Sequence, residues 1–202
     1  MEHITKVKDL YEQTVSMISQ SEESWKDFLE CMGRLYQLDF LNTCMVYVQR
    51  PDATVLAGFE QWMELNLPVM RGSKGIAVFP SKLFGENVTH VFDVSDTKGK
   101  GVRPWNWTVN GTNRRKLAKM LFPEIYEKEK KFKNSLNTFT RTYVWVMIKG
   151  EDGISKTLER LKTLTRTEAS AEEMEITQFI VNSTLYAVES RCGFTDRELD
   201  FS

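Results

Sequence analysis

The chain is poor in the residue types that most often build metal and nucleophilic sites. His3 and His90 are its two histidines, and Cys31, Cys44 and Cys192 are its three cysteines. The cysteines are odd in number, lack a Cys-x-x-Cys spacing and lie within apolar helical patterns. This usage predicts buried, reduced thiols rather than a disulfide or a zinc site. We therefore expect neither a metal ion nor a cofactor.

Long apolar runs are also lacking. No run approaches the length that spans a bilayer, and the first residues have neither the apolar centre of a signal peptide nor its cleavage site. Hydrophobic residues make up 41% of the chain and charged residues 27%, which is typical of a globular protein. These features predict a single cytoplasmic domain over residues 1–202, with no membrane partner.

Neither positive nor negative residues are in large excess, because the formal net charge is -1. The two kinds of charge are nevertheless distributed unevenly along the chain. Residues 66–119 hold ten Lys or Arg against three acids, whereas the remainder holds 17 bases against 25 acids. One positive surface on a near-neutral protein favours a polyanion as partner, and it argues against a mimic of DNA, which would need an acidic surface.

Apolar periodicity predicts three helices in the first quarter of the chain. Residues 3–19 form an amphipathic pattern, and Ser21 or Ser24 can cap the helix that follows. A third helix, over about residues 42–49, ends before Pro51 because the residue preceding a proline disfavours helical geometry. These helices are expected to form a packed scaffold.

The central part carries the strand signals. Residues 75–80 and 88–94 are rich in Val, Ile and Phe and predict neighbouring antiparallel strands. For residues 142–148 the periodicity does not decide between strand and helix. Further elements are expected at residues 105–109 (strand) and at 114–121, 123–138, 155–164 and 169–191 (helices). The fold class is therefore α+β, a helical scaffold packed on a small antiparallel sheet. Its expected parts are a helical part (1–65), a basic strand-and-loop part (66–121) and a mainly helical part (122–202).

The segment from Asn42 to Phe79 carries a recurring order of residues. Its members are Asn42, Gln49, Pro51, Ala53, Thr54, Gly58, Trp62, Val69, Gly72, Lys74, Gly75 and Ile76. This order resembles the N-terminal, single-stranded-DNA-binding domain of ArdC-type antirestriction proteins. It is most similar to the version found in proteins of Gram-positive conjugative elements.

Later stretches extend the resemblance. Residues 91–97 (VFDVSDT), 149–155 (KGEDGIS) and 189–194 (ESRCGF) are similar to further signatures of that version. The chain departs from the family in having Leu65-Asn66-Leu67-Pro68 where relatives commonly carry Leu-Gly-Arg, and Gly72-Ser73-Lys74-Gly75 in place of Gly-Glu-Lys-Gly. It also lacks the His-Glu-x-x-His peptidase motif of ArdC relatives, so that activity is not expected.

The candidate binding residues combine cations with aromatic rings. Single-strand binders need both, because cations follow the phosphates and aromatic faces stack on unpaired bases. The candidates are Arg71, Lys74, Lys98, Lys100, Arg103, Trp105, Trp107, Arg114, Arg115 and Lys116. Each group has two open interpretations. The glycines of the loop 71–75 either let a phosphate approach the backbone or only form a hairpin turn. Trp105 and Trp107 either stack on bases or cap the core.

Three further residues have two interpretations each. Asn42 and Gln49 lie two helical turns apart and either read bases or tie down the adjoining turn. His90 is either a half-buried strand residue or, with Asp93, Lys74 and Arg114, part of a metal-independent nuclease centre. Trp62, at helical spacing from its apolar neighbours, is expected in the core.

The resemblance implies a bacterial mobile-element protein with an anti-defence role. Its expected partner is single-stranded DNA or RNA, and a second is a host defence nuclease such as a CRISPR effector complex. The chain begins with Met1 and stops soon after the Arg-Cys-Gly signature, from which we expect a stand-alone inhibitor. The alternatives are a ribonuclease or nuclease-recruiting inhibitor acting on guide RNA, and a non-catalytic module that blocks a defence nuclease by protein contact.

Overall fold

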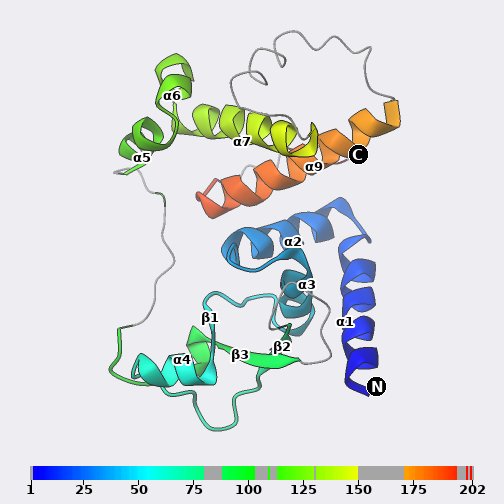
Figure 1. The fold of residues 1–202 in the computed structure, drawn as a ribbon, viewed down its shortest axis with the longest axis vertical. Coiled ribbons are helices and arrows are strands. Elements are labelled where there is room, and N and C mark those ends of the chain that lie inside the picture. The colour runs from blue at the N-terminus through cyan, green and yellow to red at the C-terminus, as the bar shows by residue number, and fades with distance from the viewer. Residues whose placement is uncertain are drawn as a thin grey trace. The chain divides into compact units, whose positions relative to one another are not determined.

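The computed structural model describes residues 2–79, 88–102, 109, 113–129, 131–149, 171–194, 199 and 201. Within these residues it contains eight α-helices and one three-stranded antiparallel sheet, which confirms the α+β fold class. The chain divides into two compact units, residues 1–107 and 108–202 (Figure 1). The division falls inside the expected basic part, so its cations belong to two units.

The first unit begins with the three expected helices, α1 (Glu2–Ile18), α2 (Glu22–Arg34) and α3 (Phe40–Gln49). Ser21 caps α2 by accepting the Ser24 N–H, and Asp39 caps α3 by accepting the Asn42 N–H. Both α1 and α2 contact α3. The Thr14 hydroxyl donates to the Cys44 carbonyl at 3.0 Å and so fastens α1 to α3.

The sheet has the strand order β1-β3-β2, with β1 (Leu56–Gly58), β2 (Ile76–Val78) and β3 (Thr89–Asp93). The expected pairing of β2 with β3 is confirmed, in a register that sets Ala77 opposite His90. Strand β1 was not predicted, because its three residues are too few to show an alternation of apolar and polar residues. A 3-10 turn, η1 (Val94–Asp96), follows β3.

Helix α4 (Phe59–Glu64) follows β1 directly and contacts both β1 and β3. Trp62 on this helix is fully buried, as expected, and its indole N–H donates to the Phe92 carbonyl at 2.9 Å. The helix ends in a Schellman motif, in which the Asn66 N–H bonds to the Met63 carbonyl and the Leu67 N–H to the Trp62 carbonyl. Asn66 takes the left-handed conformation, with φ of 56°, which asparagine tolerates better than most residues.

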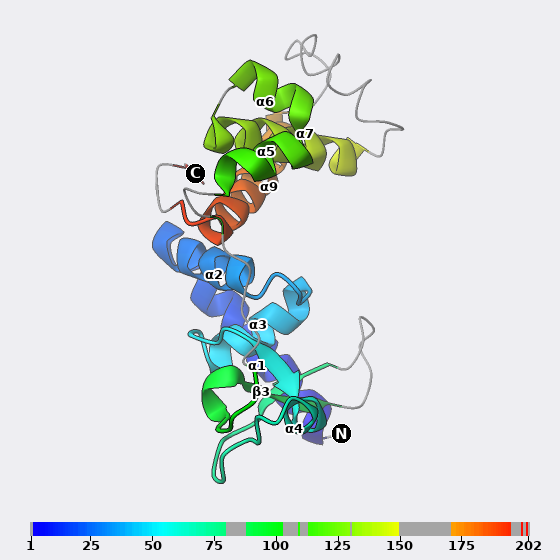
Figure 2. The ribbon, with the colours of Figure 1, turned by 90° about the vertical axis from the view of Figure 1, so that its left-hand side faces the viewer.

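The second unit is helical in its described residues, with α5 (Arg114–Leu121), α6 (Pro123–Glu129), α7 (Phe132–Lys149) and α9 (Ala171–Arg191). Helices α7 and α9 lie side by side, and α5 and α6 contact α7 (Figure 2). Residues 142–148, for which periodicity did not decide between strand and helix, are helical. The core residues include Phe122, Tyr126, Phe132, Leu136 and Cys192. The expected strand at 105–109 and helix at 155–164 lie outside the described residues, except for Val109.

Helix α9 ends as its sequence predicts. Gly193 has a φ of 75°, the left-handed conformation that favours glycine. Its N–H bonds to the Ser190 carbonyl and the Phe194 N–H bonds to the Glu189 carbonyl, which completes a second Schellman motif. In the described part of the chain, no helix has both the length and the apolar character that a bilayer crossing requires.

The three cysteines are free and buried, as expected. Burial raises the pKa of the Cys44 thiol to about 12 and that of Cys192 to about 11. A thiol protonated and buried at pH 8 is a poor nucleophile. We therefore expect Ellman's reagent at pH 8 to leave all three cysteines unmodified in the native protein and to titrate all of them in guanidinium chloride. Rapid reaction of a native cysteine would contradict this packing.

Candidate nucleic-acid interface

Two segments of the first unit run antiparallel and form what we call the basic ribbon, residues 65–74 and 96–101. The Met70 N–H bonds to the Asp96 carbonyl at 2.8 Å, and the Lys98 N–H bonds to the Pro68 carbonyl at 3.0 Å. Val69 and Thr97 form an isolated antiparallel bridge between these bonds. Backbone pairing therefore fixes the two segments in register, although they are separated by the whole of β2 and β3.

Close backbone approach explains two glycines of the ribbon. A Cβ atom on Gly101 would lie 1.9 Å from the Leu65 carbonyl oxygen, and one on Gly99 would lie 2.3 Å from the Asn66 carbonyl oxygen. Both obstacles are backbone atoms, so neither can move aside as a side chain would. Because residues 99 and 101 lack side chains, the second segment packs closely against the residues that follow α4. The Lys100 side chain between them is exposed.

The loop 71–75 contains a β-turn over Met70–Ser73, closed by the Ser73 N–H to the Met70 carbonyl at 3.2 Å. Gly72 stands at the third position with a φ of 91°, which a type II turn requires. A Cβ on Gly72 would meet nothing within 4 Å, whereas one on Gly75 would lie 2.9 Å from the His90 Cβ. Gly72 thus borders open space that a phosphate can enter. Gly75 instead lets the chain before β2 pack closely against His90 of β3.

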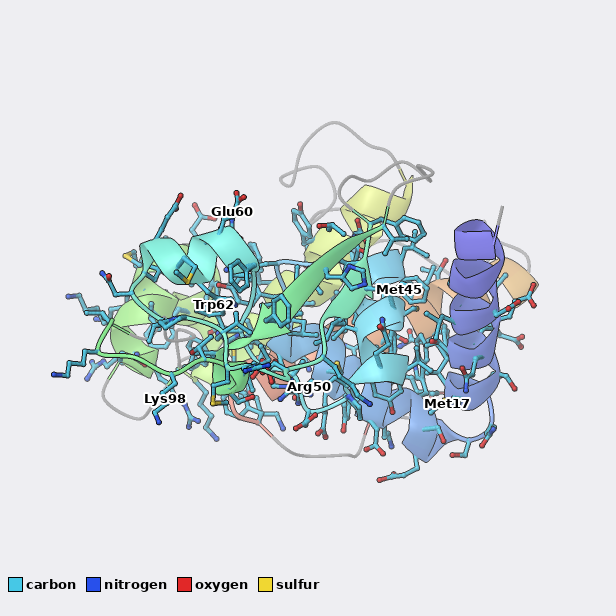
Figure 3. The ribbon with its side chains drawn as sticks, turned by 90° about the horizontal axis from the view of Figure 1, so that it is seen from below. Met17, Met45, Arg50, Glu60, Trp62 and Lys98 are labelled. Carbon is cyan, nitrogen blue, oxygen red and sulfur yellow. The ribbon has the colours of Figure 1, made fainter. Side chains whose placement is uncertain are left out.

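The ribbon carries four exposed cations, Arg71, Lys74, Lys98 and Lys100. Figure 3 shows Lys98 on the ribbon near the helix that carries Trp62. None of the four forms an ion pair with another described residue. Four unpaired positive charges on one backbone-paired ribbon make a local positive field.

Two acids on or beside the ribbon, Asp93 and Asp96, are bonded within the protein, whereas Glu64, which directly precedes the ribbon, is exposed. The Asp93 carboxylate is 3% exposed and accepts five hydrogen bonds. One oxygen accepts from the Thr54 N–H, the Thr54 hydroxyl and the Val55 N–H, and the other from the Ser95 N–H and hydroxyl. Burial alone would raise the pKa of Asp93, but the bonds from Thr54, Ser95 and Val55 outweigh it and hold the pKa below its usual range.

Asp96 is neutralised by Arg50, whose guanidinium lies 2.6 Å from its carboxylate. The same guanidinium donates to the Ser95 hydroxyl at 2.7 Å, and Asp96 also accepts the Asp93 N–H at 3.1 Å. These bonds tie the chain exit after α3 to η1. The sequence signal for this network is the Asp-x-Ser-Asp pattern at residues 93–96, which sequence reasoning took for a strand and turn.

Asn42 and Gln49 both bind the outer edge of β2. The Asn42 amide accepts the Phe79 N–H at 2.8 Å and donates to the Phe79 carbonyl at 3.3 Å. The Gln49 amide makes the same pair of bonds to Ala77, each at 3.0 Å. Two side chains of α3 thus replace the strand that the edge of β2 lacks, so both amides have a structural role.

Of the remaining six candidates, three belong to the second unit and three lie outside the described residues. Arg114, Arg115 and Lys116 form the first turn of α5 in the second unit, and the Arg114 guanidinium lies 4.6 Å above the Phe194 ring. Arg103, Trp105 and Trp107 lie outside the described residues. The structure therefore brings together four of the ten sequence candidates.

His90 is exposed on β3. Asp93 lies three residues further along the same strand, on the opposite face, and its oxygens are already occupied. Arg114 belongs to the other unit. Within the first unit, His90 and Asp93 therefore do not form the acid/base pair of a nuclease centre. Nor do the described residues contain a group of three or more His, Cys, Asp or Glu side chains that could hold a metal ion.

No protein-family model matches the chain, and neither a curated protein nor a solved structure is significantly similar to it.

Proposed function

We propose that this protein binds single-stranded DNA or RNA through the basic ribbon, as an anti-defence protein of a bacterial mobile element. The observation that carries the proposal is the set of four exposed cations on a backbone-paired ribbon, none of which forms an ion pair with another described residue. A negatively charged strand can bind there without displacing an existing ion pair, so little of the attraction is lost.

The anti-defence role follows from the resemblance to the ArdC-type domain. In that role the protein occludes incoming single strands, or the guide RNA of a defence nuclease, rather than cleaving them. Occlusion is supported by Asp93, because a carboxylate with both oxygens bonded is not free to act as the acid or base of a nuclease.

Binding should depend steeply on salt. Each phosphate contact to a single strand contributes about 0.7 to the slope of log affinity against log salt. Replacing Arg71, Lys74, Lys98 and Lys100 together with Gln should therefore reduce that slope by about 3 and weaken binding at low salt by orders of magnitude. Fluorescence anisotropy with labelled single-stranded DNA and RNA at several salt concentrations measures both quantities.

A matched variant controls for net charge. Arg115, Lys116, Lys119 and Lys131 are also four exposed cations, all in the second unit. Their replacement with Gln removes the same charge but should change the slope much less. Equal losses in the two variants would show that binding follows net charge and not the ribbon. Gel recovery of intact RNA after incubation tests occlusion, and progressive cleavage would favour the ribonuclease alternative.

A further inference from the structure

The outer edge of β1 borders a cavity of about 240 Å³. One wall comes from the residues after α2, which include Tyr36 and Gln37, and the other from residues 54–57. Trp62 of α4 and Leu65, the residue that follows this helix, complete the lining. The cavity is smaller than the pockets that enclose drug-sized ligands, so it suits a single planar group.

Strand β1 presents an unused donor and acceptor to this cavity. The Val94 N–H bonds to the Val55 carbonyl, which makes residues 55 and 94 a hydrogen-bonded pair of the ladder. In an antiparallel pair such residues alternate, so the N–H and C=O of the next residue, Leu56, point away from β3. Both groups thus lie on the outer edge of β1, and Leu56 lines the cavity.

An aromatic ring stands at the rim of the cavity. Tyr36 is 45% exposed, a high fraction for a ring that lines a cavity, and its hydroxyl accepts from the Gln37 amide at 3.1 Å. Nucleobases are held by this combination of parts: an aromatic face for stacking, and a donor beside an acceptor for the hydrogen-bonding edge of the base.

The cavity and the basic ribbon have Leu65 in common. Leu65 lines the cavity, and its carbonyl is the atom that the backbone of Gly101 approaches so closely. Asn66, the next residue, accepts the Gly101 N–H at 3.3 Å. Lys100 is exposed and directly precedes Gly101, so its charge lies on the segment that packs against Leu65.

We propose that the cavity between Tyr36 and β1 takes one unpaired base of a strand whose phosphates lie on the basic ribbon. This inference rests on the proposed function and adds to it a specific site for a base. The Leu56 N–H and C=O bond to the edge of that base, and Tyr36 stacks on it. The cations give affinity for any strand, and the cavity gives a preference for strands that carry bases.

Oligomers with and without bases test the inference. A labelled thymidine oligomer of about twelve nucleotides, a length within the site sizes of single-strand binders, is compared with an abasic oligomer of equal length. The wild-type protein should bind the thymidine oligomer at least about fivefold more tightly, the low end of one stacked base. An abasic oligomer with one central thymidine should regain most of the difference, because the cavity holds one base.

Three variants locate the preference. Tyr36→Ala should bind both oligomers with the affinity of the wild-type protein for the abasic one, and Tyr36→Phe should keep the preference. Phe59→Ala is the control, because Phe59 is a 52% exposed ring that does not line the cavity. Circular dichroism confirms that each variant is folded.

Two outcomes would overturn the inference alone. Equal affinity of the wild-type protein for both oligomers would show that the cavity holds no base. An extended peptide paired with the edge of β1 would then be the alternative ligand. A full preference in Tyr36→Ala would place the base elsewhere. If neither oligomer binds even at low salt, the ribbon itself fails as a binding surface, and the base site fails with it.

Discussion

Replacement of Asp93 with Asn should lower the free energy of unfolding by about 3–6 kcal/mol, because at least two hydrogen bonds to a charged acceptor are lost and each contributes about 1.5–3 kcal/mol. An amide keeps one acceptor oxygen and places an NH₂ group where the other stood. Each carboxylate oxygen accepts at least two bonds, so at least two donors lose their acceptor in either orientation. Urea denaturation at pH 7 measures the change.

The same substitution should remove part of the acid sensitivity of the protein. The pKa of Asp93 is lower in the folded than in the unfolded state. Its contribution to stability is therefore fully present above the unfolded-state pKa of about 4 and is lost as pH falls through the folded-state pKa. Between these two pKa values the wild-type protein should lose stability, and Asp93→Asn should lose correspondingly less.

Asp52→Asn is the matched control. Its side chain is 82% exposed and lies 3.8 Å from the Arg50 guanidinium, so the ion pair is screened by water. This change should alter stability by at most about 1 kcal/mol. A loss in Asp93→Asn as small as that in Asp52→Asn would show that the bonds from Thr54, Val55 and Ser95 do not stabilise the fold.

The pattern of the sequence predicted several elements well, because apolar residues that recur over two or more turns reveal the helical period. Helices α1, α3 and α5 and the β2–β3 pair begin and end within a few residues of the expected positions. Gly193 and Pro51 mark helix ends through backbone preferences that act locally. Such signals need no knowledge of tertiary contacts.

The candidate site was less accessible to sequence reasoning. The cations were evident from composition, but the backbone pairing of residues 65–70 with 96–101 is a contact between distant segments. Strand β1 has three residues, and the cavity beside it is built from residues whose composition is ordinary. Asp93 illustrates the difficulty best, since the Asp-x-Ser-Asp pattern signals its two bonds from Ser95 but not the three from the distant Thr54 and Val55.

Substitution of Asn42 or Gln49, the two amides of α3, tests whether they serve the structure or recognise a ligand. The two substitutions are expected to change stability by different amounts. Asn42 is 7% exposed and bonds the buried Phe79 backbone, so Asn42→Ala removes an acceptor from a buried N–H and a donor from a buried C=O. Leaving such groups unsatisfied costs about 1–3 kcal/mol each, and we expect a total loss of about 2–4 kcal/mol in urea denaturation.

Gln49→Ala should have a smaller effect. The Gln49 bonds to the Ala77 backbone lie at an exposed position, where water can replace the lost amide. We expect a loss of at most about 1 kcal/mol, the net value of a typical hydrogen bond. The edge of β2 would then be open, so this variant should also self-associate more readily at high concentration, which light scattering measures.

Nucleic-acid affinity separates the two interpretations of these amides. If they serve the sheet edge, each variant that remains folded should bind a single strand with the salt dependence of the wild-type protein, because all four ribbon cations are retained. Loss of affinity without loss of stability would instead assign Asn42 and Gln49 to base reading. In the structural case, the resemblance at these two positions reflects how α3 completes the sheet, and the chemistry of binding lies in the ribbon and the cavity beside β1.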